Sequence, residues 1–76
     1  MISFDEISEK ICTGMNGLSA IHILNNMNIN FHTVETNQTL TVFVPVENGM
    51  SEIKISKEDN SVLYLEATHI LNQEDL

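Results

Sequence analysis

The sequence predicts an α+β fold in which two N-terminal helices pack on one face of a three- to four-stranded antiparallel meander sheet. Two runs rich in β-branched residues, 39–46 and 51–56, meet at Asn48-Gly49, a strong short-range signal for a β-hairpin. Apolar residues recur at helical spacing in the part of the chain before residue 28. A chain of 76 residues is expected to form one small domain, 1–76, with a modest core.

A capping box predicts the start of the first helix. The Ser3 hydroxyl can accept from the N–H of Glu6, while the Glu6 carboxylate reaches back to the N–H of Ser3. Gly14 and the Asn16-Gly17 pair predict its end, so we expect a helix over residues 4–13. Its apolar stripe is Phe4, Ile7, Ile11 and Met15.

A second helix is predicted over residues 18–27, and Asn28 is expected to stop it. Both helices are too short to be stable alone, so their apolar stripes must pack on the sheet. The stripe of the second helix is Leu18, Ile21, Leu24 and Met27.

Alternating residues predict a first strand over 29–34, followed by a turn at 36–38. After a polar turn at 57–61, in which Asn60 is suited to left-handed geometry, residues 62–67 form either a strand or part of a helix over 63–71. We favour the strand, with Leu65 opposite Ile55, because Asp-Asn-Ser before Val-Leu-Tyr-Leu is typical of a meander. That strand places Leu63, Leu65 and Ala67 on one face, and residues 73–76 are expected to form a frayed acidic tail.

Two registers are open for the central hairpin. A two-residue type I′ loop at Asn48-Gly49 places Val44 opposite Ile53, and we favour it because it matches aliphatic side chains. A left-handed bulge at Gly49 instead places Phe43 opposite Ile53. In either register the strand 39–46 has apolar residues on both faces, so one face is core and the other needs a cover or a partner.

Pro45 lies inside this strand and has no N–H to donate to a neighbouring strand. It therefore indicates a ladder that is locally broken or that faces a sheet edge.

The charge balance restricts the partners. Eleven acidic residues and three Lys give a formal net charge of −8, which repels nucleic acid and anionic membranes. We expect no direct nucleic-acid or membrane binding, and a partner protein with a basic surface. The alternative is that the charge only keeps a small domain soluble.

Enzymatic chemistry is not indicated. Cys12, His22, His32 and His69 show no metal-binding spacing, and Cys12, near a helix C-terminus, is expected to be a small core or rim residue. No paired carboxylates or phosphate-binding glycine loop are visible, so we expect no enzyme and no cofactor. A single cysteine and the lack of a signal-like or membrane-spanning segment make the cytoplasm the expected location.

The favoured function is a phage or mobile-element inhibitor that blocks a nucleic-acid-binding host protein of the defence or replication machinery, with carboxylates in place of phosphates. The alternatives are a homodimeric structural module joined through the free sheet face, and an immunity-type partner of a basic toxin. All three are protein-binding roles without catalysis.

Candidate partner-binding residues follow from this hypothesis. Phe43, with Phe31 as its neighbour, is the candidate anchor on the uncovered face, and the alternative is that both are ordinary core. The acidic candidates form one group near the hairpin ends and a second group on the first helix, and the alternative for both is a solvated surface. These groups are Glu47, Glu52, Glu58 and Asp59, and Asp5, Glu6 and Glu9.

Overall fold

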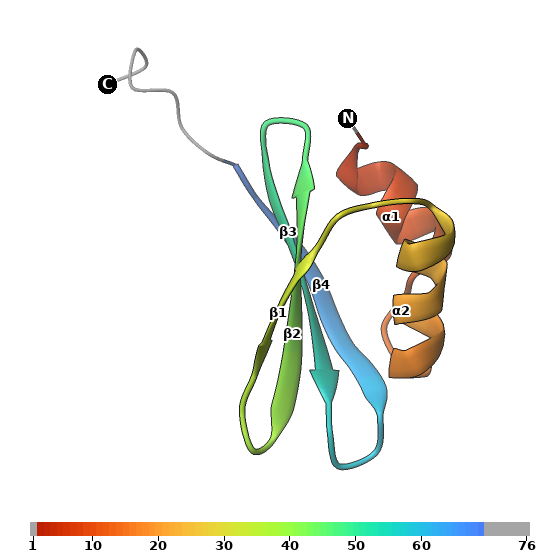
Figure 1. Ribbon diagram of the computed structural model, residues 1–76, viewed down its shortest axis with the longest axis vertical. Coiled ribbons are helices and arrows are strands. Elements are labelled where there is room, and N and C mark those ends of the chain that lie inside the picture. The colour runs from red at the N-terminus through yellow and green to blue at the C-terminus, as the bar shows by residue number, and fades with distance from the viewer. Residues whose placement is uncertain (1, 70–76) are drawn as a thin grey trace.

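The computed structural model describes residues 2–69 and contains two helices and one four-stranded antiparallel sheet (Figure 1). The strands follow one another in the order β1-β2-β3-β4, so the sheet is a meander. The α+β class is therefore as predicted, with the larger of the two expected strand numbers. The elements are α1 (Phe4–Lys10), α2 (Gly17–Asn26), β1 (His32–Glu35), β2 (Thr39–Val46), β3 (Gly49–Ser56) and β4 (Ser61–His69).

Local hydrogen bonds set the helix ends. The predicted capping box is present, with the N–H of Glu6 donating to Ser3 Oγ at 3.3 Å. Extended backbone at Ile11 ends α1 at Lys10, three residues before the expected end. The Asn16 side chain caps α2 by accepting from the N–H of Ser19 at 3.1 Å. Asn28, with a φ of 58°, follows α2 as predicted.

Buried side chains of both helices and of three strands form a single hydrophobic cluster. Ile7 and Leu24 in the helices and Ile53 in β3 have no exposed surface. Leu18, expected in the helical stripe, is instead 62% exposed, and the buried residues of α2 are Gly17, Ala20 and Leu24. The cluster comprises Ile7, Ile11, Ala20, Leu24, Val42, Val44, Val46, Ile53, Ile55 and Val62.

The hairpin β2–β3 forms as predicted, but both expected registers were wrong. Its loop is Glu47-Asn48, because Asn48 has a φ of 63° while Gly49 is not in the left-handed region. A type I′ loop needs positive φ at both central residues, and the bulge needs it at Gly49. The paired residues on the core side are Leu40 with Ile55, Val42 with Ile53, Val44 with Ser51 and Val46 with Gly49.

Residues 61–69 form strand β4, so the helix alternative was wrong within the described residues. The expected pairing was also wrong, since Leu65 lies opposite Ile53 and Val62 lies opposite Ile55. Leu63 is an extra residue between two paired positions, which is a β-bulge. The bulge turns Leu63 outward, 44% exposed, and gives its expected core position to Val62. Ile70, Leu71 and residues 73–76 lie outside the described part of the chain.

Strand β1 is shorter and later than predicted, because Ile29 and Phe31 pack against the core before the strand begins. Its pairing with β2 ends at His32 and Phe43, so Pro45 lies on a part of β2 that is an edge. This confirms the edge-facing interpretation of the proline. The helices α1 and α2, at 7 and 10 residues, are too short to cross a bilayer.

Candidate functional site

The strand pairing defines a second sheet face, opposite the side chains of the hydrophobic cluster, which we call the open face. Successive side chains of a strand point to opposite faces, and paired residues share one. Phe43, Met50 and Tyr64 on this face are half-buried, and Val34 is 53% exposed. Its members include His32, Val34, Thr41, Phe43, Pro45, Met50, Glu52, Lys54, Tyr64, Glu66 and Thr68.

Tyr64 lies on this face in the edge strand β4 and contacts two side chains of β3. Its hydroxyl donates to Glu52 Oε2 at 2.9 Å, and Lys54 Nζ lies 5.6 Å from the centroid of its ring. The hydrogen bond to the Glu52 carboxylate stabilises the protonated phenol, which raises the pKa of Tyr64 above its ordinary value. These contacts hold the tyrosine side chain against β3.

Two carboxylates stand directly opposite each other beside this tyrosine. Glu52 on β3 pairs with Glu66 on β4, so like charges face each other across the two strands. The ion pair found within residues 2–69 joins Lys57 to Glu35, and it involves neither of these carboxylates. Within residues 2–69 the open face therefore carries two carboxylates that form no ion pair, next to the apolar side chain of Phe43 and near Lys54.

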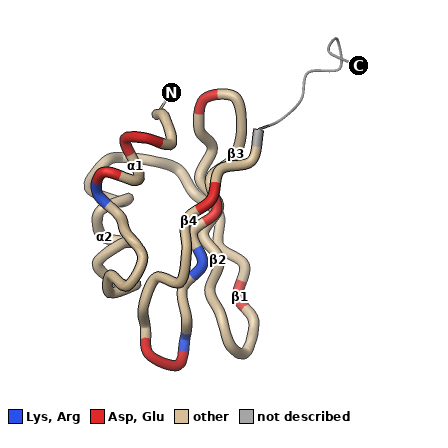
Figure 2. Tube along the Cα trace, turned by 180° about the vertical axis from the view of Figure 1, so that it is seen from behind, with Lys and Arg blue, Asp and Glu red and all other residues tan. Residues whose placement is uncertain are grey.

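The acidic residues of the hairpin ends are not brought together. Glu47 lies in the β2–β3 turn, whereas Glu58 and Asp59 lie in the β3–β4 turn at the opposite end of β3, with Glu52 between the two ends (Figure 2). Ser61 donates to the Asp59 carboxylate at 2.8 Å, and this hydrogen bond lowers the pKa of Asp59. The second group, Asp5, Glu6 and Glu9, lies on α1 with all three side chains exposed.

The two phenylalanine candidates, Phe43 and Phe31, lie on different sides of the sheet. Phe43 lies on the open face, as expected for an anchor, with His32 as its neighbour on β1. Phe31 packs against the hydrophobic cluster instead, which fits the alternative of an ordinary core residue.

Sequence reasoning missed Tyr64, Glu66 and Lys54 as members of the site. The signal was present in the alternation of β4, where Tyr64 and Glu66 flank the half-buried Leu65. The alternation assigns Tyr64 and Glu66 to the open face only if the bulge at Leu63 is recognised. The extra residue exchanges the faces of all the residues that follow it in the strand.

The thiol and imidazole groups that the structure describes are those of Cys12, His22 and His32. Cys12, expected to be a core or rim residue, is exposed and so is not part of the core, and His22 and His32 are exposed as well. The side chain of His69 lies outside the described atoms. Across residues 2–69, no group of three or more His, Cys, Asp or Glu side chains lies close enough together to hold a metal ion.

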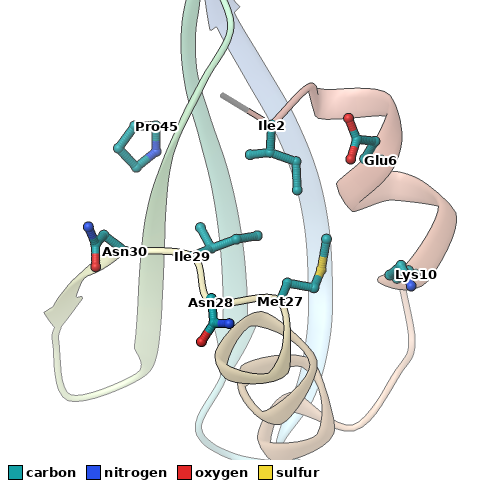
Figure 3. A pocket seen from close by; sticks show the side chains of 8 residues that line it. All are labelled: Ile2, Glu6, Lys10, Met27, Asn28, Ile29, Asn30 and Pro45. Atoms are coloured by element: carbon teal, nitrogen blue, oxygen red, sulfur yellow. The ribbon is translucent and has the colours of Figure 1, made fainter.

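A separate pocket of about 660 Å³ lies between α1, the end of α2 and β2 (Figure 3). Ile2, Met27 and Ile29 form an apolar wall, and Glu6 and Lys10 bring opposite charges to the α1 side. The Glu6 carboxylate already accepts from Ser3 in the capping box, so it has a structural role here. The remaining lining residues are Asn28, Asn30 and Pro45.

Comparison of the chain with models of protein families, with curated proteins and with solved structures gives no match.

Proposed function

We propose that this protein is a non-enzymatic protein-binding domain whose two helices cover one face of the sheet and whose open face docks on a basic surface of another protein. The observation that carries the proposal is the directly opposed pair Glu52 and Glu66, neither of which forms an ion pair within residues 2–69, although Lys54 lies nearby over the ring of Tyr64. A partner lysine or arginine placed between the two carboxylates neutralises a repulsion that the isolated domain retains.

The opposed carboxylates give a cationic partner side chain something to neutralise. Like charges directly opposite each other in a sheet are destabilising, and a guanidinium can satisfy carboxylate oxygens through paired hydrogen bonds. Phe43 beside Glu52, with Met50 and Val34 on the same face, supplies apolar contact around that polar centre. A charged centre flanked by apolar area suits recognition of a basic surface that surrounds an apolar site.

The same face favours a foreign partner over a second copy of this chain. Two copies docked face to face around a twofold axis bring two Glu52–Glu66 pairs toward each other, which adds repulsion between the subunits. An inhibitor of phage or mobile-element origin that blocks a nucleic-acid-binding protein is the narrower form of the proposal. An immunity-type partner of a basic toxin uses the same contact.

Differential capture tests the proposal. Immobilised wild-type protein, the double variant Glu52→Gln/Glu66→Gln and the control Glu47→Gln/Glu58→Gln are exposed to a bacterial lysate, and retained proteins are identified by mass spectrometry. Both variants lose the same charge, but only the first loses it from the open face. The proposal expects a specific basic protein retained by wild type and control and depleted about tenfold or more by the first variant.

Retention that falls equally in both double variants contradicts the proposal, because total charge then explains it. For the narrower form, the captured protein is purified and titrated with labelled DNA or RNA in the presence of this domain. Competition that weakens steeply with salt supports phosphate mimicry, and simultaneous binding of domain and nucleic acid contradicts it.

A further inference from the structure

The outer edge of β4 is divided into a covered part and an uncovered part. Gly14 N–H donates to the Val62 carbonyl at 2.7 Å, and Val62 N–H donates to the Met15 carbonyl at 2.8 Å. The loop between α1 and α2 thus pairs with the beginning of this edge. Beyond the bulge, residues 64–69 have backbone hydrogen-bond partners only in the β3 ladder, as far as residues 2–69 are concerned.

This uncovered segment is regular. Residues 64–69 pair one-to-one with β3, from Tyr64 opposite Lys54 to His69 opposite Gly49. Six residues of regular strand span about 20 Å, which is enough to align a short extended peptide. Figure 1 shows β4 running away from the two helices toward its C-terminal end. As far as residues 2–69 are concerned, the backbone groups on its outer side are therefore available for pairing.

The two sides of the segment differ in chemistry. Leu65, which packs against the hydrophobic cluster, and Ala67 lie on the core side. Tyr64, Glu66 and Thr68 lie on the open face. A strand added along this edge therefore meets apolar side chains on one side and a carboxylate on the other.

We propose that an extended segment of the basic partner joins the sheet as a fifth strand along residues 64–69 of β4, and this inference rests on the proposed function. The segment alternates basic side chains, which face Glu66, with apolar side chains, which extend the layer of Leu65 and Ala67. Main-chain hydrogen bonds supply affinity in such strand addition, and alternate side chains supply specificity.

A second copy of this chain is the poorer occupant of the edge. Antiparallel pairing of two β4 segments centred near Glu66 brings the two Glu66 carboxylates close together, and like charges opposed across strands destabilise a sheet. A carboxylate on an edge strand hinders self-pairing but attracts a basic strand.

The test uses the full chain labelled with ¹⁵N and the synthetic peptide acetyl-Lys-Val-Lys-Val-Lys-Val-amide. Two control peptides are used, one with the same composition in block order and one N-methylated at every internal residue. The expected result is amide shift changes concentrated at residues 64–69 and affinity lowered about tenfold or more by N-methylation, because a methylated backbone cannot pair with the edge.

Matched charge reversals complete the test. Glu66→Lys should weaken the alternating peptide about tenfold or more, whereas Glu58→Lys, with the same change of net charge, should stay within about twofold of wild type. Glu66→Lys places a lysine opposite Glu52, so it should unfold at a urea concentration no lower than wild type.

Equal affinity for the N-methylated peptide, absence of binding by the alternating peptide, or shift changes confined to Phe43 and Glu52 overturns strand addition. The proposed function is then still tested by the differential capture experiment, because that experiment compares charges on the open face and does not depend on pairing along the edge of β4.

Discussion

Replacing Gly17 with alanine should destabilise the protein, although alanine normally stabilises a helix. A Cβ at Gly17 meets Ile55 Cγ2 at 2.5 Å and Asn60 Oδ1 at 2.8 Å. Both distances are well inside ordinary van der Waals contact, so Ile55 or the helix start must move. The N–H of Gly17 donates to the Asn60 carbonyl at 2.9 Å, which opposes movement of the helix away from β3.

The magnitude follows from two opposing effects. Overpacking a filled core costs about 1–3 kcal/mol. Alanine recovers at most about 1 kcal/mol of helix propensity relative to glycine. The difference is roughly 0–3 kcal/mol, and we expect Gly17→Ala to lower the free energy of unfolding by the middle of that range, about 1–2 kcal/mol, measured by urea denaturation followed by circular dichroism.

The control is His22, which is exposed in the same helix. There His22→Ala should be more stable than His22→Gly by about 1 kcal/mol, because only propensity differs. The close approach of α2 to β3 would be refuted if Gly17→Ala were as stable as wild type while His22→Ala remained more stable than His22→Gly.

Two further predictions concern buried and open-face polar groups. Ser51 is fully buried, and its hydroxyl has no hydrogen-bond partner within the described residues. Ser51→Ala should therefore raise the free energy of unfolding by roughly 1 kcal/mol, because it removes an unsatisfied buried polar group. An unchanged or lower midpoint of urea denaturation contradicts this prediction. Tyr64 is the one tyrosine of the chain, and absorbance titration should give a pKa above the ordinary 10.0, moving toward that value in Glu52→Gln. Because folding raises this pKa, its stabilising contribution is complete below the unfolded pKa and is lost as pH rises through the folded one. A wild-type pKa at or below 10.0 contradicts the hydrogen bond to Glu52.

Sequence reasoning predicted the features that depend on neighbouring residues. The capping box of Ser3 and Glu6 and the left-handed turn at Asn28, which follows α2, are formed by groups within a few positions of each other. The left-handed geometry of Asn60 was predicted for the same reason, since asparagine tolerates positive φ and marks turns. The hairpin also follows from local signals, although its exact loop does not.

The tertiary structure decided how these elements meet. A two-residue difference in register, the bulge at Leu63 and the packing of Phe31 against the core depend on which arrangement fills the space between the helices and the sheet. Side-chain alternation makes the open face sensitive to each of these choices, because one added residue exchanges the two faces of a strand. Short-range hydrogen bonds and turn geometry therefore determined the helix cap at Ser3 and the left-handed asparagines, while long-range packing placed Glu52 and Glu66 opposite each other on the open face.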